Sequence, residues 1–288
     1  MARPDHDVTG RIARLLVFPV KSCAGIEVEE AVLCATGLAF DRAWMLVDRG
    51  GEFVTQRACP RLALIRPQLA PDRLVLRAPG MPDMEIPSNL GGRPVQVRVW
   101  DDTVGAHDMG DAVAHWASGF LDRPLRLVRF DPGGRRLSNP HWTRGLEAPN
   151  QFSDGYPLLV AGEASLASLN DRLAAAGHAA AGMNRFRPNI VLCGIEAHDE
   201  DRLDVLRLST PGHAVEIGLV KPCTRCPIPD IDPATAASSP EVSTTLQTYR
   251  RNPRFGGVVT FGMNAIVLRG AGAVLRVGQV VAADYRFD

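Results

Sequence analysis

Two cysteines in a proline-rich segment constrain this chain more than any other feature of its sequence. Cys223 and Cys226 are separated by two residues, one of which is Arg225, and Pro229 and Pro233 follow closely. A redox Cys-x-x-Cys pair usually opens a helix, whose N-terminus lowers the thiol pKa. Proline inside a helix removes a hydrogen-bond donor and clashes with the preceding turn. The segment therefore predicts a rigid extended loop that holds both cysteines.

The residues alone argue against one interpretation of this loop and leave two open. A structural zinc site needs four ligands, usually from a second Cys or His pair at similar spacing, and no such pair follows. The cations Lys221 and Arg225 favour a thiolate that binds one soft metal centre or attacks an electrophile. The remaining interpretation is two inert thiols in a protein core, which the spacing does not exclude.

The composition is that of an ordinary globular protein and predicts no nucleic-acid or membrane partner. Of the 288 residues, 45% are hydrophobic and 22% are charged, and 32 Lys and Arg balance 32 Asp and Glu. The six cysteines are scattered, unlike the disulfide framework of a small secreted domain. We find no signal peptide, and no apolar run reaches the roughly 18 residues of a membrane span. These observations predict a cytoplasmic protein.

The first hundred residues have the pattern of short β-strands. Alternating or β-branched runs are separated by Gly, Pro, Asp or Asn, which is typical of a compact β-barrel or sandwich. A helix is expected over 108–121, with Asp108 and Asp111 as a capping pair, and a Pro-, Gly- and Arg-rich surface loop over 131–152. The strands are expected at 11–18, 27–34, 42–47, 61–65, 73–77 and 94–100.

The second half mixes strands with two further helices. Leu166, Leu169 and Leu173 share one face of a helix expected over 163–176. Pro240, with Ser239 as its cap, predicts the start of another helix that ends near residue 249. Helices placed between non-adjacent strands favour the α+β class. The later strands are expected at 189–192, 203–208, 214–220, 263–268, 274–277 and 279–285.

Motifs spread over nearly the whole chain occur in an order known from one family. They lie at 17–23, 41–44, 99–102 and 108–111, then at 152–159, 163–166, 185–191, 223–226, 232–233 and 261–264. Together they resemble MOSC proteins with an N-terminal MOSC β-barrel domain, which include the mitochondrial amidoxime-reducing component and bacterial proteins that detoxify N-hydroxylated bases. The resemblance implies an N-terminal β-barrel-like domain over 8–128 and a mainly β MOSC barrel with a few helices over 129–288.

The resemblance also implies a molybdenum-dependent oxidoreductase that converts N–OH to N–H in small N-hydroxylated substrates. Its cofactor would be the molybdenum cofactor, a molybdopterin that holds the metal. Cys226 has the position of the thiolate that ligates molybdenum in the family, whereas Cys223 is expected to pack or to support it. Asp232 is placed with Cys226 in the catalytic set, where it would order the cysteine loop or handle protons.

The family pattern surrounds the cofactor with polar residues. Arg and Lys suit its phosphate, because Arg offers a planar fork of donors and Lys a point charge. Gly155 and Tyr156 replace the Thr-Ser of the mitochondrial relatives, so backbone contacts are expected there. The cofactor-binding residues implied in this way are Lys21, Ser22, Arg42, Asp154, Gly155, Tyr156, Arg187, Asn189, Thr224, Arg225 and Asn264.

Electrons are expected to come from a separate protein. Some bacterial relatives continue into a ferredoxin-like domain with four cysteines, and this sequence holds no such cluster. A flavoprotein, a ferredoxin or a haem protein is therefore implied as donor. Two other functions stay open: a MOSC sulfur carrier or sulfurtransferase that uses a persulfide on Cys226, and a protein that stores or carries the molybdenum cofactor.

Overall fold

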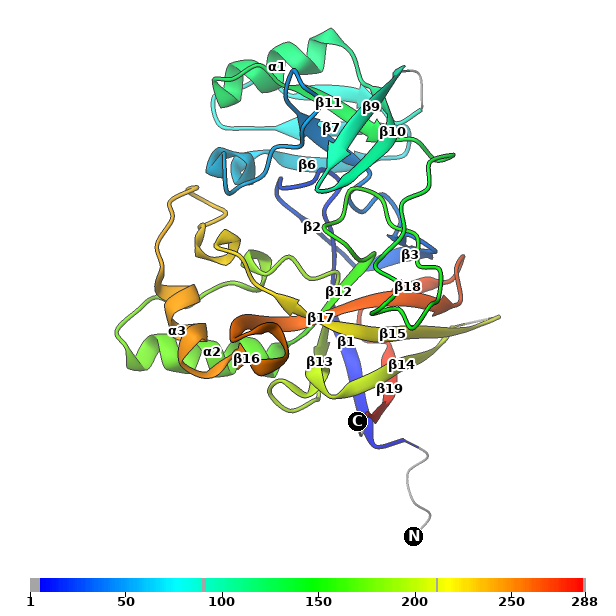
Figure 1. The fold of residues 1–288 in the computed structure, drawn as a ribbon, viewed down its shortest axis with the longest axis vertical. Coiled ribbons are helices and arrows are strands. Elements are labelled where there is room, and N and C mark those ends of the chain that lie inside the picture. Colours follow the sequence, from blue (N-terminus) through cyan, green and yellow to red (C-terminus); the bar gives the residue numbers. More distant parts are fainter. Residues whose placement is uncertain (1–5, 90–91, 211, 287–288) are drawn as a thin grey trace.

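A closed barrel of seven strands forms the lower half of the molecule (Figure 1). The protein is represented by a computed structural model, described for residues 6–89, 92–210 and 212–286. In spatial order the strands are β12 (Leu158–Gly162), β13 (Ile190–Cys193), β1 (Val8–Val17), β19 (Val280–Tyr285), β14 (Leu203–Thr210), β15 (His213–Thr224) and β17 (Val258–Arg269). The barrel closes because its first and last strands, β12 and β17, pair with each other.

The barrel takes strands from both ends of the sequence. β1 pairs with β13 on one side and with β19 on the other. The chain then leaves the barrel, builds the upper body, and returns for the remaining barrel strands (Figure 1). Shorter strands extend this half: β2 (Ile26–Val28) on β1, β16 (Arg251–Asn252) on β17, and a sheet of β18 (Val274–Arg276), β3 (Glu30–Cys34) and β4 (Gly37–Leu38).

The upper body consists of two small antiparallel sheets and one helix. α1 (Asp111–Leu121) packs its buried face, which includes Val113, Trp116 and Phe120, against a core of this body. One sheet contains β5 (Trp44–Val47), β11 (Arg126–Phe130), β10 (Asp102–Asp108) and β9 (Arg93–Val99). The other contains β6 (Arg66–Ala70), β7 (Arg73–Arg77) and β8 (Met84–Pro87), preceded by the short helix η1 (Pro60–Leu64).

Two helices cover one side of the barrel. α2 (Glu163–Ala175) crosses over between the parallel strands β12 and β13, and α3 (Glu241–Tyr249) lies beside it (Figure 1). Leu169, Leu173 and Leu246 fill the core between these helices and the barrel. The short helices η2 (Met183–Arg185), η3 (Asp199–Asp201), η4 (Ile228–Asp230) and η5 (Pro253–Phe255) occupy connections. With many strands and few helices, the structure confirms the α+β class.

Several local predictions need correction. Residues 61–65 form most of η1 rather than a strand, because Pro60 supplies a fixed φ and no donor at the first helical position. Ser239 does not cap α3; instead the carboxylate of Asp230 accepts a hydrogen bond from the backbone N–H of Ser243 at 2.8 Å. The cysteine segment opens no α-helix, as predicted, but the short helix η4 begins two residues after Cys226. Cys223 belongs to strand β15, and only Cys226 lies in the loop between β15 and η4.

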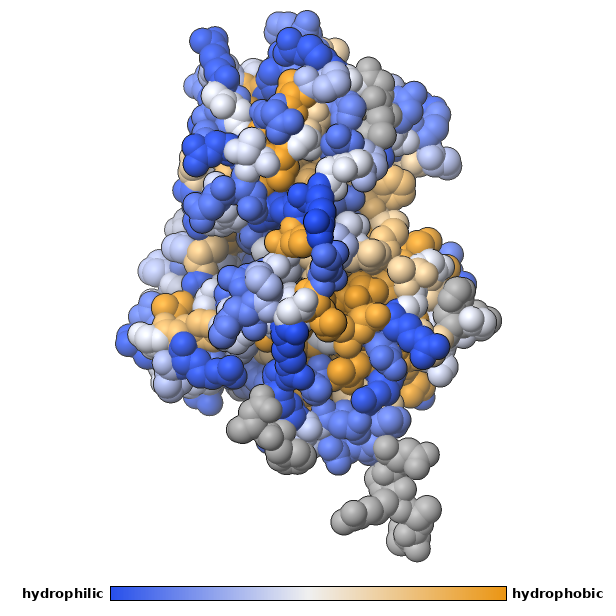
Figure 2. All heavy atoms as spheres, turned by 45° about the vertical axis from the view of Figure 1, so that its right-hand side comes forward, coloured by the Kyte–Doolittle hydropathy of each residue, from blue (hydrophilic) through white to orange (hydrophobic). Residues whose placement is uncertain are grey.

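Surface hydropathy differs between the two halves. On the face in Figure 2, the upper half is mostly hydrophilic, whereas apolar residues gather on the lower half. The most exposed large apolar side chains include Leu146, Val258 and Val280. Val258 begins strand β17 and borders a groove beside the cysteine loop.

Candidate functional site

One pocket collects nearly all of the residues that the sequence assigned to a cofactor. Its walls come from the loop after β1, from the connections 150–157 and 186–189, and from the β15 and β17 strands. The upper body contributes Thr55 and Arg57. The sequence-assigned residues that line it are Lys21, Ser22, Arg42, Asp154, Gly155, Tyr156, Arg187, Asn189, Thr224, Arg225, Cys226 and Asn264. Asp232 is the one assigned residue outside it.

The pocket wall carries a large excess of positive charge. Lys21, Arg42, Arg57, Arg187 and Arg225 line it, and the one carboxylate among the lining side chains is that of Asp154. A cavity wall with more cations than carboxylates favours an anionic or electron-rich ligand over a neutral one. The charge balance of this pocket therefore differs sharply from that of the whole chain, which is zero.

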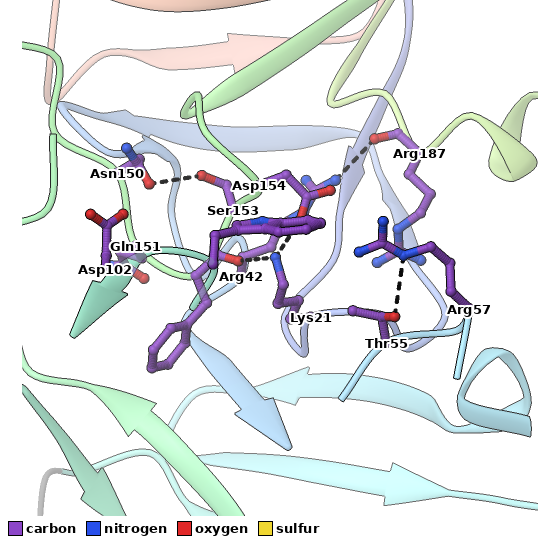
Figure 3. A network of polar contacts seen from close by, with 12 residues as sticks. Lys21, Arg42, Thr55, Arg57, Asp102, Asn150, Gln151, Ser153, Asp154 and Arg187 are labelled. Carbon is purple, nitrogen blue, oxygen red and sulfur yellow. Dashed lines mark hydrogen bonds and ion pairs between the residues drawn. The ribbon is translucent and has the colours of Figure 1, made fainter. Parts of the chain in front are cut away.

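Lys21 forms the centre of the polar network in Figure 3. Its side chain is almost fully buried, and Nζ donates to the carbonyl oxygen of Phe152 at 2.7 Å and to Oδ1 of Asp154 at 2.5 Å. Burial lowers the pKa of Lys21, although Asp154 opposes the shift. Desolvation acts to raise the pKa of Asp154, but the charge and hydrogen bond of Lys21 outweigh it and hold that pKa below its usual range. Asp154 therefore opposes the loss of charge that burial favours at Lys21.

Two arginines flank one aromatic ring on the opposite side of this network. The guanidinium carbons of Arg42 and Arg187 lie 4.4 and 4.3 Å from the ring centroid of Phe18. Arg42 also donates to Oδ2 of Asp41 and to the carbonyl of Arg187, so the two arginines are held together (Figure 3). Burial, and then the charge of Arg42, lowers the pKa of Arg187 to about 9. An anion beside Arg187 would relieve this repulsion.

The side chain of Asn189 links neighbouring strands by hydrogen bonds. Its side chain accepts from the backbone N–H of Leu159 at 3.1 Å and from Arg42 at 3.2 Å, and donates to the carbonyl of Leu16 at 3.2 Å. These contacts link β1, β12 and the start of β13, and they use most of the hydrogen-bonding capacity of the amide. Asn189 therefore orients Arg42 from behind.

Three residues of the pocket have left-handed backbone conformations. Ser22, Arg42 and Arg187 have φ values of 66°, 49° and 59°. Non-glycine residues rarely adopt this region, and they keep it only where the surrounding structure fixes them. Ser22 follows the barrel strand β1, Arg187 precedes the barrel strand β13, and Arg42 lies between β4 and β5, so three strained turns bring their side chains to one cavity.

The side of the pocket that carries Cys223 and Cys226 is formed by the irregular strand pair β15 and β17. The register of β15 and β17 shifts between Leu219 and Lys221 and again between Pro222 and Thr224. Such bulges bend a strand and accommodate a proline that cannot donate to the ladder. Opposite them, Gly262 has φ 74°, and a Cβ there would lie 2.7 Å from the carbonyl oxygen of Val160. Glycine is therefore required for this bend.

The two cysteines have different surroundings. Cys223 Sγ accepts a hydrogen bond from Arg225 Nη1 at 3.1 Å, and Arg225 Nη2 also donates to the carbonyl of Phe186 at 3.0 Å. Cys223 thus helps to hold the guanidinium in place. Cys226 is partly buried and makes no hydrogen bond through Sγ with any residue that the structure describes. Its sulfur is the one left available to a ligand in the pocket.

Asp232 has a structural environment. Its carboxylate accepts from Arg185 at 2.8 Å and from the backbone N–H groups of Ala234 and Thr235 at 2.8 and 3.1 Å. The backbone hydrogen bond of Ala234 is the main cause that lowers the pKa of Asp232, and Arg185 adds to it. A carboxyl that stays ionised and fully bonded orders the loop, and it is a poor proton donor near neutral pH.

Comparison with known proteins agrees with this geometry. Residues 9–124 match the MOSC N-terminal beta barrel domain, and residues 147–282 match the MOSC domain. The chain belongs to the MOSC family. The mitochondrial amidoxime-reducing component 1 of Homo sapiens is 37% identical over 253 residues, which cover 84% of this chain and 72% of the relative. For the mitochondrial amidoxime reducing component 2 of Bos taurus the identity is 33% over 251 residues, with the same coverage.

A crystal structure of the YUAD protein from Bacillus subtilis aligns with 97% of this MOSC family member and 98% of that chain, with a TM-score of 0.41 and 11% identity. That likeness is too weak to bear on function. Across the described ranges 6–89, 92–210 and 212–286, no helix is both long and apolar enough to cross a membrane.

Two arginines of this MOSC pocket were missed by sequence reasoning. Arg57 lines the cavity, with its guanidinium carbon 4.6 Å from the Trp100 ring centroid, and it reaches the pocket from the upper body. Arg136 is buried behind the wall and donates to the carbonyl oxygens of Gln151, Ser153 and Asp154 at 2.9, 2.6 and 3.2 Å. Arg136 therefore fixes the loop that carries Asp154, although nothing local in the sequence separates it from a surface arginine.

Proposed function

We propose that this protein is a molybdenum-cofactor-dependent reductase that converts N-hydroxylated compounds to their N–H forms. The observation that carries the proposal is the pairing, in one pocket, of a cation-rich wall with the free sulfur of Cys226. The relatives named amidoxime-reducing components share most of the length of the chain, which supports the same class of substrate.

The residues present fit this cofactor. Among the described residues, Arg187 Nη2, Arg225 Nε and Tyr156 Oη are buried polar atoms with no hydrogen-bond partner. Buried donors without partners are costly, so a ligand rich in acceptors, such as a phosphate and a pterin, would satisfy them. A thiolate at Cys226 suits a soft metal centre. Lys21, Arg42 and Arg187 would hold the phosphate end, and Cys226 would ligate molybdenum.

The protein contributes position and charge to the proposed reaction. When bound, the cofactor supplies the two-electron chemistry, and N–OH plus two electrons and two protons gives N–H plus water. Arg225 lies next to Cys226 in the chain, so it would keep positive charge beside the thiolate. Cys223 would orient Arg225 through the 3.1 Å hydrogen bond. Asp154 would keep Lys21 charged and directed along the pocket wall.

A separate donor protein, either a flavoprotein, a ferredoxin or a haem protein, would supply the electrons. The sequence has no Gly-x-Gly-x-x-Gly turn between a strand and a helix, which is the usual cradle for a dinucleotide pyrophosphate. Our proposal includes a cytoplasmic location, which rests on the composition alone.

The test uses protein made in a host that synthesises the cofactor. We expect molybdenum in the purified protein and reduction of benzamidoxime, or of an N-hydroxylated purine base, with reduced methyl viologen as electron donor. NADH alone should give no turnover. Molybdenum-loaded protein that is inert toward a panel of N–OH compounds would favour cofactor storage, and a persulfide on Cys226 without molybdenum would favour sulfur transfer.

A further inference from the structure

A second groove adjoins the cation-rich pocket described above at the cysteine loop. It has a volume of about 350 Å³, which is in the range of small-molecule sites. The groove runs between α3 and the start of β17, two segments that lie close together in Figure 1. It shares Arg225 and Cys226 with the cation-rich pocket, so these two residues form a wall common to both.

The lining of the groove is apolar with a few polar groups. Its apolar residues are Pro227, Pro229, Leu246, Val258 and Val259, and its polar or charged ones, besides the shared pair, are Ser243, Gln247 and Arg251. The side chain of Gln247 is exposed and forms no hydrogen bond with the described residues, so its amide is available to a ligand. A flat apolar body with one polar end matches this surface.

The charge of the groove is positive. No Asp or Glu is among its lining residues, and the carboxylate of the nearby Asp230 is engaged in a hydrogen bond from the backbone N–H of Ser243. Arg251 donates through Nε to the carbonyl of Gln247 at 3.2 Å and has no acidic partner within the described parts of the chain. A cation in this groove would meet Arg225 and Arg251 without a compensating carboxylate.

We propose that this groove is the substrate site and that it selects uncharged N-hydroxylated compounds with a flat apolar body. The inference rests on the proposed function, since it places the N–OH group at the wall formed by Cys226. An amidoxime is uncharged near neutral pH, whereas the amidine that reduction produces takes up a further proton and becomes a cation. Arg251 and Arg225 therefore repel the product but not the substrate, and the groove favours product release.

Equilibrium binding without an electron donor tests this inference, because no turnover occurs. We expect the purified protein to bind benzamidoxime at least about fivefold more tightly than benzamidine. Arg251→Glu should shift the ratio of the two dissociation constants about five- to tenfold toward benzamidine, since two unit charges change beside the ligand. Arg269→Glu is the matched control, because it makes the same charge change at the other end of β17 and should leave the ratio unaltered.

A size test uses neighbouring positions of α3. Ser243→Phe should fill the groove and weaken benzamidoxime binding at least tenfold, whereas Thr244→Phe, exposed and outside the groove, should not. Molybdenum content should be unchanged in both variants. The inference is overturned if the wild-type protein does not prefer benzamidoxime, or if each variant behaves like its control. If binding follows these expectations but no N–OH compound is reduced, the proposed function fails and the groove assignment stands.

Discussion

The cation-rich pocket and a second buried polar cluster, formed by Ser165, His198 and Glu200, share three features that are often taken to mark a functional site. Both bury ionisable groups, since Glu200 and Lys21 are almost inaccessible. Both contain a left-handed residue, which in the second cluster is His198 with φ 67°. Among the described residues, both also hold polar atoms without a hydrogen-bond partner, namely the two ring nitrogens of His198 and Nη2 of Arg187.

The two regions differ in charge and in access. Burial raises the pKa of Glu200 to about 7 and lowers that of His198 to about 4, so both groups are driven toward their neutral forms. Ser165 donates to Glu200 at 2.7 Å, and none of the cavities described above is lined by this cluster. In the pocket, by contrast, Lys21 is paired with the carboxylate of Asp154, and Arg187 lines a cavity with its Nη2 unpaired among the described residues. Buried charge that is retained beside a cavity distinguishes a binding site from a structural cluster.

The largest expected effect is at Cys226. We expect Cys226→Ser to remove the molybdenum, which should be about one per chain in the parent protein, and to reduce viologen-driven turnover at least about a hundredfold. Cys223→Ser should keep most of the metal, because Cys223 contacts Arg225 rather than the open pocket. Metal analysis and a benzamidoxime assay measure both. Equal loss in the two variants, together with zinc held by sulfur, would remove the distinction between the cysteines.

The next effect concerns the cations of the pocket. Arg187→Ala should weaken cofactor retention about tenfold to a hundredfold, as expected for a charge-assisted phosphate contact of about 1.5–3 kcal/mol. Lys21→Ala should act in the same direction. Arg172→Ala, which removes a cation stacked 4.0 Å from the ring centroid of Tyr249 beside the second cluster, should retain the cofactor. The molybdenum content of the three variants is compared after prolonged dialysis. Full retention in all three would argue against a phosphate site formed by Lys21, Arg42 and Arg187.

A smaller effect should appear in the second cluster as a pH dependence of stability. The pKa of Glu200 in the folded protein, about 7, lies above its ordinary value of 4.5, so the folded state binds the proton more tightly than the unfolded state. Stability is therefore highest below the ordinary value and falls as pH rises through about 7. Glu200→Gln should stabilise the protein by about 1–3 kcal/mol at pH 8 and much less at pH 5. Urea unfolding at both pH values tests the sign, and a larger gain at pH 5 would refute it.

The smallest effect is expected at Asp232. Asp232→Asn should change turnover less than about threefold and cost about 1 kcal/mol of stability, because it weakens the bond to Arg185 but leaves an acceptor for the backbone N–H groups. A loss of more than a hundredfold in turnover, with metal content and unfolding midpoint unchanged, would show that Asp232 handles protons after all.

The sequence predicted which residues line the pocket better than it predicted which loops and strands contact one another. The residues that reached the pocket, such as Lys21, Arg187 and Asn264, were recognised from short motifs in a fixed order. Arg57 and Arg136 were missed, because no local pattern marks an arginine in a loop as part of a pocket. Arg57 is exposed, and the buried Arg136 depends on carbonyls such as that of Ser153. One usable signal was present, since the segment 131–152 has few apolar residues to anchor it and therefore needs a polar anchor.

Strand pairing was also beyond local patterns. The alternation in residues 11–18 predicted a strand but not its neighbours, which are β13 and β19 near the other end of the chain. The predicted domain boundary between residues 128 and 129 divides the chain by sequence position. In space, however, β1 belongs to the same barrel as the strands that follow this boundary. The strands β6, β8, β10 and β11 were not anticipated, because Pro, Gly or charged residues interrupt their apolar runs. β12 was also missed, although Leu158–Ala161 is an uninterrupted apolar run.

The pairing of β1 with β19 has a consequence for biosynthesis. Val8 lies opposite Ala283, so β1 cannot complete its pairing until a strand made roughly 270 residues later has left the ribosome. At 5–20 residues per second this delay lasts about 15–55 s. During that time β1, with its buried Leu15 and Leu16, has neither barrel neighbour complete for most of the interval. The Leu15–Val17 end of β1 can pair early with β2, but the rest of the strand's edges lack partners until β13 and then β19 are made, and such an unpaired edge is the kind of segment that chaperones bind.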